Sequence, residues 1–219
     1  MSEELLNIPF DIHGGGMDLK FPHHENEIAQ ACCYAKKTDD ATSYAKYWMH
    51  NGFVTIQDEK MSKSLDNFLL IRDCLKKYDG EIIRLSLLSS HYRSPLSWNE
   101  NLLEQSKSIL TKFYKFLMLN RSVKVDRIEN IQLPEQIKEA LYDDLNLAKV
   151  FTQLNAILAR EKISSSRDSI TKTKEIILKT ASILGILQKE PSDWLETGKP
   201  KLNDEEFIKN LIEERNILR

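Results

Sequence analysis

The sequence predicts an α/β part over residues 1–100 and an all-α part over residues 101–219. Two short runs that favour strands, at residues 8–16 and 52–56, stand beside glycines in the first part. Three stretches between residues 101 and 187 place apolar residues three and four apart, which is the period of an amphipathic helix. Such helices bury their apolar stripes against one another, so an antiparallel bundle is expected there.

Composition excludes a membrane span and a generally basic surface. The 219 residues are 41% hydrophobic and 29% charged, with a formal net charge of -2, so a polyanion would have to be bound by local basic patches. No apolar run reaches the roughly 18 residues that cross a bilayer. Three cysteines without a pattern indicate a reducing cytoplasm, and Cys32 and Cys33 are expected to be buried free thiols.

The first strand is expected in IPFDIHGGG, where it would run into a turn at Gly14, Gly15 and Gly16. Consecutive glycines let another group approach the backbone more closely than any Cβ would permit, although a flexible turn is the alternative. The stretch YWMHNGFVTI predicts a second strand around Gly52 to Ile56. Because two short strands make a meagre sheet, we expect further sequence in front of the first residue.

The stretch FPHHENEIAQ, residues 21–30, predicts a helix with a candidate metal site. On a helix, His23 and Glu27 lie one turn apart on the same face, as two zinc ligands do. His24 would point about 100° away from them. The metalloprotease motif H-E-x-x-H is absent, and two ligands do not close a site, so a solvated helix face is the alternative.

The stretch EKMSKSLDNF, residues 59–68, predicts a polar loop between a strand and a helix. Lys60 and Lys63 bring two ammonium groups beside the hydroxyls of Ser62 and Ser64. Such a cluster suits the negative charge that develops on a leaving polyphosphate. A solvated lysine pair is the alternative interpretation.

The all-α part is expected to hold three long helices and then a linker. The helices are predicted from apolar stripes in residues 101–120, 134–161 and 168–187. Pro134 stands where the start of a helix tolerates proline, and three serines at 164–166 separate the second helix from the third. Residues 188–203 are predicted to be a linker, after which Asn203 and Glu206 form the capping box of a last helix that is still running at the end of the chain.

Taken together, these motifs resemble those of the class I aminoacyl-tRNA synthetases. KMSKS at residues 60–64 is similar to their signature, while FDIHGGGMDLKFPHHENEIAQ, YWMHNGFV and SSHYRSPL are similar to segments of cysteinyl-tRNA synthetases. YDDLNLAKVFTQL is similar to part of the helical anticodon-binding domain. The resemblance implies the C-terminal part of a Rossmann-like catalytic domain at residues 1–57, a KMSKS loop and stem-contact region at 58–100, and an antiparallel anticodon-binding-type bundle at 101–219.

The resemblance also implies the reaction and the location. L-cysteine would be activated by ATP, with Mg²⁺, to cysteinyl-AMP and then transferred to tRNA(Cys), in a monomeric cytoplasmic enzyme without membrane attachment. His23 and Glu27 would bind Zn²⁺ together with two cysteines, and zinc suits the soft sulfur of the substrate thiolate. Discrimination by one such strong bond can be large enough to make editing unnecessary.

The remaining implied roles concern ATP and the substrate pocket. The residues assigned to ATP are Lys60, Met61, Ser62, Lys63 and Ser64, of which Lys60 and Lys63 would be catalytic by stabilising the leaving pyrophosphate. The residues assigned to the pocket for the amino acid and adenosine are His13, Gly14, Gly15, Gly16 and Asp18.

Departures from the family keep two alternatives open. Asp66 stands where the family usually has glycine, and the family's His-Ile-Gly-His motif and zinc cysteines would lie in front of Met1. The residues given are therefore expected to be an inactive portion of an enzyme, because a site with two of its four ligands binds zinc weakly. The alternatives are a related cysteine ligase that acts on an amino-sugar and a non-catalytic RNA-binding paralogue.

Overall fold

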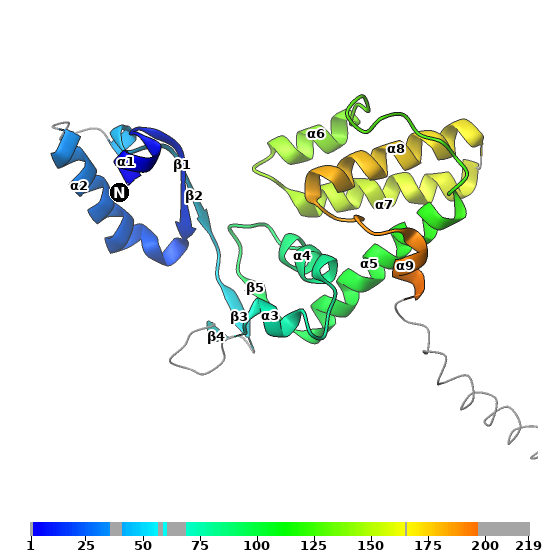
Figure 1. Cartoon of the computed structure of the whole chain (residues 1–219), viewed down its shortest axis with the longest axis horizontal. Helices are drawn as coiled ribbons and strands as arrows, with labels where there is room; N and C mark the ends of the chain where they lie inside the picture. Colours follow the sequence, from blue (N-terminus) through cyan, green and yellow to red (C-terminus); the bar gives the residue numbers. More distant parts are fainter. Residues whose placement is uncertain (1, 36–40, 57–58, 61–68, 165, 197–219) are drawn as a thin grey trace, which may run out of the picture. The chain divides into compact units, whose positions relative to one another are not determined.

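The computed structural model describes residues 2–35, 41–56, 59–60, 69–164 and 166–196 (Figure 1). The chain divides into two compact units. The first consists of Met1–Ser106 and Pro134–Asn155, and the second of Lys107–Leu133 and Ala156–Arg219.

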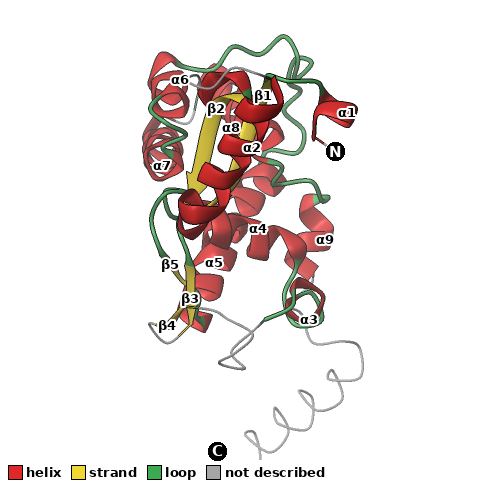
Figure 2. Cartoon of the chain, turned by 90° about the vertical axis from the view of Figure 1, so that its left-hand side faces the viewer, coloured by secondary structure: helices red, strands yellow, loops and turns green. Residues whose placement is uncertain are grey.

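A parallel pair of strands organises the start of the first unit, after the short helix α1 (Ser2–Leu6). β1 (Phe10–Gly16) pairs with β2 (Ala45–Asn51), and α2 (Glu25–Ala35) lies in the connection between them. Parallel neighbours need such a crossover connection. α2 covers one face of the strand pair (Figure 1, Figure 2).

The glycine turn predicted at the end of the first strand is wrong. Gly14, Gly15 and Gly16 belong to β1 itself and pair with Met49, His50 and Asn51 of β2. Glycine is compatible with extended backbone, so these glycines do not reverse the chain. Their lack of side chains lets other groups lie close to the β1 backbone.

The second predicted strand is correct only at its end. β2 stops at Asn51, and β3 (Val54–Ile56) belongs to another sheet, where it pairs with β4 (Glu59–Lys60) and with β5 (Leu96–Ser97). Gly52 lies between β2 and β3, and a Cβ there would collide with the carbonyl group of Ser94. Glycine thus lets the chain pass close to the segment that leads into β5.

The first unit also contains two short helices, α3 (Ile71–Cys74) and α4 (Gly80–Leu88). Asp79 caps α4 by accepting a hydrogen bond from the amide of Glu81 at 3.0 Å. α4 buries Leu85, and its Ser86 hydroxyl donates to the hydroxyl of Ser106 on α5 (Glu100–Leu119) at 2.9 Å. The predicted helix near residue 71 is therefore present but short.

The second predicted long helix is interrupted. Residues 134–161 form α6 (Glu135–Tyr142) and α7 (Leu147–Ser164), with a turn between them. Asp144 and Leu145 in this turn have positive φ angles of 48° and 57°, which a continuing right-handed helix excludes. The Asn146 side chain then caps α7 by accepting a hydrogen bond from the amide of Lys149 at 3.1 Å.

The third predicted helix is confirmed as α8 (Arg167–Leu184) in the second unit. Ser166 caps its first turn, and Gly185 ends it with a φ of 65°, the left-handed conformation that favours glycine. Lys174 donates hydrogen bonds to the carbonyl groups of Asn120 and Val123, at 2.9 and 2.7 Å, and thereby holds the chain that follows α5.

The prediction of a linker at 188–203 is wrong for its first part, because residues there form α9 (Pro191–Glu196). Trp194 of α9 is buried, stacks on Tyr114 with ring centroids 4.7 Å apart, and donates from Nε1 to Thr111 at 3.0 Å. One large aromatic side chain therefore fixes this segment to α5. The capping box predicted at residues 203 and 206 lies outside the described residues.

No helix within the described ranges has both the length and the apolar character needed to span a bilayer.

Candidate functional site

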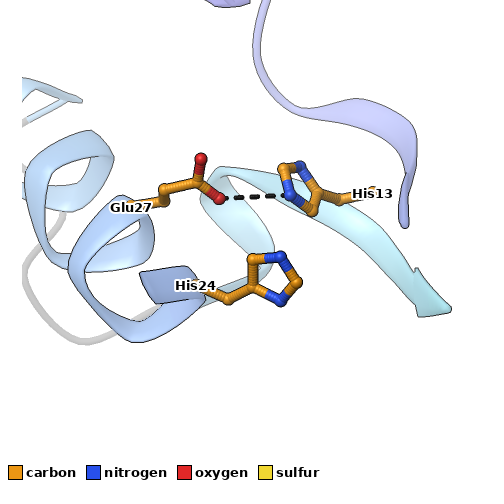
Figure 3. Close-up of side chains that lie close together, drawn as sticks. All are labelled: His13, His24 and Glu27. Carbon is orange, nitrogen blue, oxygen red and sulfur yellow. Dashed lines mark ion pairs between the residues drawn. The ribbon is translucent and has the colours of Figure 1, made fainter. Parts of the chain in front are cut away.

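Three side chains, from β1, α2 and the turn before α2, converge beside the parallel strand pair. His13 comes from β1, His24 ends the turn that leads into α2, and Glu27 lies one turn farther along. Figure 3 shows Glu27 and His13 pointing toward each other with His24 beside them. In the described part of the chain, one potential metal-ligand atom from each lies within 4.8 Å of the others.

The Glu27 carboxylate lies between two histidines. One oxygen is 3.1 Å from Nε2 of His13, and the other is 3.5 Å from Nε2 of His23, which precedes it by one helical turn. Within the described residues the oxygen that faces His13 is buried and forms no hydrogen bond of acceptable geometry. A bound cation is one way in which such a buried oxygen can be satisfied, and histidine nitrogen and glutamate oxygen are both zinc ligands.

His24 is the most enclosed member of this group, with 3% of its surface exposed. Its Nδ1 lies 2.9 Å from Nε2 of His50 at the end of β2, so one ring donates a hydrogen bond to the other. Burial lowers the pKa of His24, and the neighbouring His13 lowers it further, which keeps the ring neutral at pH 7. Neutral imidazole is the form that accepts a hydrogen bond or binds a metal.

Trp48 of β2 closes the site on one side. Its ring centroid lies 4.6 Å from that of His13 and 5.2 Å from that of His24. Tyr44 also packs against His13, with ring centroids 5.6 Å apart, and lies next to Trp48. These aromatic walls restrict the orientation of both imidazoles and exclude water from part of their surface.

The glycines of β1 have distinct surroundings. A Cβ on Gly15 would lie 2.8 Å from Cε1 of His24, whereas a Cβ on Gly14 would meet only the carbonyl oxygen of Met49, at an ordinary 3.6 Å. A Cβ on Gly16 would lie 2.5 Å from Oδ1 of Asp18. The close approach expected from the three glycines is therefore present, and at Gly15 the approaching group is a histidine of the chain itself.

The predicted site residues are brought together only in part. His13, Gly15, His23 and Glu27 lie at one site, while Lys60 contributes described backbone to β4 and residues 61–64 lie outside the described ranges. His24, Trp48 and His50 also belong to this site, although no sequence motif predicts them. His50 pairs with Gly15 in the β1–β2 register, a relation that becomes visible only when the correct strand partner is known.

The expectation for the two neighbouring cysteines is half correct. Cys32 is buried, with its sulfur 3.5 Å from the Ser43 hydroxyl. Cys33 is exposed, which contradicts the prediction of a buried thiol. Neither belongs to the cluster of His13, His24 and Glu27 found in the described ranges.

Residues 1–108 match a family model described as the class I (C) tRNA synthetase catalytic domain. A cysteine–tRNA ligase from Rickettsia massiliae (strain Mtu5) is 40% identical over 214 residues, which make up 97% of this chain and 44% of that protein. Another cysteine–tRNA ligase, from Ehrlichia ruminantium (strain Gardel), is 40% identical over 218 residues, 99% of this chain and 45% of its own length. Residues 1–108 belong to the class I tRNA synthetase catalytic-domain family.

The resemblance inferred from the sequence motifs is thereby confirmed, and the relatives favour the synthetase over the amino-sugar ligase. The fold of the chain also resembles that of a LeuRS from Agrobacterium radiobacter K84, solved with tRNA and LeuAMS. The TM-score is 0.63 at 13% identity, covering 84% of this chain and 28% of the other. The mixed α/β fold of the first part is as predicted. The chain spans less than half the length of the curated relatives that it matches.

Proposed function

We propose that this chain is a portion of a cysteine–tRNA ligase, which activates L-cysteine with ATP and Mg²⁺ and transfers it to tRNA(Cys). The observation that carries the proposal is the Glu27 carboxylate held between His13 and His23 beside a parallel strand pair. Ligands of α/β proteins bind outside the carboxyl ends of such strands. The names of the curated relatives support the same reaction.

The donor set fits zinc, which takes nitrogen from histidine and oxygen from glutamate. His23 and Glu27 would hold the ion together with two cysteines implied by the resemblance, and the bound ion would favour the thiolate of cysteine over the hydroxyl of serine. His24, neutral and fixed by His50, would form the wall of the pocket beside Gly15. Trp48 would exclude water from the amino-acid side chain.

The other predicted roles extend this proposal along the chain. Lys60 and Lys63, with the backbone of residues 60–64, would stabilise negative charge on the departing pyrophosphate. Residues 58–100 would contact the tRNA stem, and residues 101–219 would form the anticodon-binding bundle. The whole enzyme would act as a cytoplasmic monomer.

A chimera tests the activity, because the chain spans only 44% of the Rickettsia relative. This chain would replace the matching segment of that ligase, and transfer of labelled cysteine to tRNA would be measured with ATP, Mg²⁺ and Zn²⁺. Charging is expected in the chimera and should fall at least about a hundredfold when Lys63→Ala removes one charge from the transition state. A folded chimera that forms no cysteinyl-adenylate would contradict the proposal.

Zinc binding by the 219-residue chain provides a separate readout, measured by competition with a chromogenic chelator. His23→Ala should weaken zinc binding by about tenfold or more, the loss that even an outer-shell change produces. His24→Gln should have a smaller effect because that ring is already bonded to His50. The reverse order would assign the metal to His13, His24 and Glu27 instead.

A further inference from the structure

Asp144, in the turn between α6 and α7, holds residues 91–93 by both of its carboxylate oxygens. Oδ1 accepts a hydrogen bond from the Tyr92 hydroxyl at 2.7 Å, and Oδ2 accepts one from Nε of Arg93 at 2.6 Å. A second Arg93 nitrogen lies 3.4 Å from Oδ1, and Nε2 of His91 lies 3.8 Å from Oδ2. Three consecutive residues of one segment therefore face one carboxylate.

The turn presents this carboxylate in a fixed geometry. Asp144 and Leu145 both have positive φ angles, and the Asn146 amide donates to the carbonyl groups of Ala140 and Asp143, each at 3.0 Å. The adjacent Asp143 side chain instead lies 3.2 Å from Nδ2 of Asn146 and 3.7 Å from Nζ of Lys149. The two neighbouring aspartates thus have separate partners.

The segment held by Asp144 is bonded in turn to the end of β2. The Gly52 amide donates to the carbonyl oxygen of Tyr92 at 2.7 Å, and a Cβ on Gly52 would collide with Ser94. Two residues before Gly52 stands His50, which bonds to the buried His24. Hydrogen bonds and a short stretch of chain therefore connect the α6–α7 turn, through residues 92 and 52, to the histidine cluster.

We propose that Asp144 is a positioning residue that, through Tyr92 and Arg93, holds residues 91–94 against Gly52 and so fixes the end of β2 that carries His50. This link ties the start of α7 to the strand pair within the first unit. It does not depend on the proposed reaction, since it would position the histidine cluster for any ligand. Hydrogen bonds from Arg93 and Tyr92 lower the pKa of Asp144, so the carboxylate that makes the link is charged at neutral pH.

Amide hydrogen exchange of the 219-residue chain, followed by NMR at Gly52, tests the link directly. Asp144→Asn keeps a residue type that tolerates positive φ but removes the charged acceptor. Exchange at Gly52 should accelerate about fivefold, a modest effect because the pair is partly exposed. Asp143→Asn is the matched control, with the same charge change in the same turn, and should leave Gly52 unchanged.

The pattern of exchange separates positioning from a general loss of stability. The acceleration should be confined to residues 45–53 and 91–96, while amides in α5 keep their wild-type rates. Adding Arg93→Gln to Asp144→Asn should produce no further acceleration at Gly52, because both remove the same link. The proposal would be overturned if Asp143→Asn and Asp144→Asn accelerated exchange at Gly52 equally, or if exchange accelerated uniformly through α5. It would also be overturned if the effects of Asp144→Asn and Arg93→Gln on Gly52 were additive. Tyr92→Phe, which removes only a hydroxyl, gives the same test if Asp144→Asn does not fold.

Discussion

Adding one methyl group at Gly15 should loosen the histidine cluster, whereas the same change at Gly14 should not. A Cβ on Gly15 would lie 2.8 and 2.9 Å from two ring atoms of His24. The ring cannot move away freely, because it is buried and is bonded to His50 at 2.9 Å. Gly15→Ala must therefore displace either a strand or a fixed imidazole.

The size of the effect follows from two opposing terms. Overpacking a fixed site costs about 1–3 kcal/mol, while replacing glycine by alanine in extended backbone gains about 0.5–1 kcal/mol through the entropy of the unfolded chain. Taken at the middle of both ranges, Gly15→Ala should then destabilise the strand pair by about 1 kcal/mol net. At Gly14 the nearest atom would be 3.6 Å away, so only the entropy term remains and that variant should be neutral or slightly stabilised.

Hydrogen exchange in β1 and β2 measures this local free energy. The entropy gain is common to both variants, so the overpacking cost of about 1–3 kcal/mol separates them, and protection in Gly15→Ala should fall by about fivefold or more relative to Gly14→Ala. Far-ultraviolet circular dichroism would confirm that the helices remain folded in both variants. Equal protection in the two variants would refute the reasoning, since it would mean that His24 does not lie against Gly15.

Three further changes test other parts of the structure. Trp194→Ala should destabilise the second unit by about 3 kcal/mol or more in urea unfolding, because the indole stacks on Tyr114 and is buried; the loss of α9 alone, with no shift of the transition, would contradict this. Lys174→Met should cost about 1–2 kcal/mol by removing two hydrogen bonds to carbonyl groups, whereas the exposed Lys172→Met should change little. The pKa of Asp144 is lowered below its usual 3.8, so its stabilisation exists above that pH and is lost as the pH falls through the folded-state value. As the pH falls below 3.8 toward the folded-state pKa, the unfolding midpoints of wild type and Asp144→Asn should therefore converge, and a constant gap would count against the contact.

Periodicity predicted the long helices because each buries a continuous apolar stripe. α5 and α8 begin and end within a few residues of the expected positions. The break after α6 was missed because Leu141, Leu145 and Ala148 maintain helical spacing across it. What breaks the helix is the left-handed backbone at Asp144, stabilised by Arg93 from 51 residues away, and no local pattern encodes that contact.

The strands were predicted less well because their pairing is not local. Gly52 was placed inside a strand, although the close passage of Ser94 is what requires a glycine there. The metal prediction rested on His23 and Glu27 being one helical turn apart, and the distance of 3.5 Å between them agrees with that geometry. His13 reaches the same carboxylate from β1, and only the pairing of β1 with β2 brings His50 and Trp48 to the cluster.

Glu27 would complete the proposed metal site with one of two sets of histidines, and the burial of the histidines distinguishes the two sets. His24 already uses one nitrogen in the bond to His50, and its ring is packed against Gly15 and Trp48, so moving it to follow an incoming ion would disturb both strands. The side chain of His23 is 59% exposed and shares a helix face with Glu27, so it can rotate toward an ion at small cost. A fixed imidazole suits the wall of a pocket, and an adjustable one suits a ligand that must match tetrahedral geometry. The same argument gives His13 an orienting role: its contact with Glu27 leaves the other carboxylate oxygen directed toward His23.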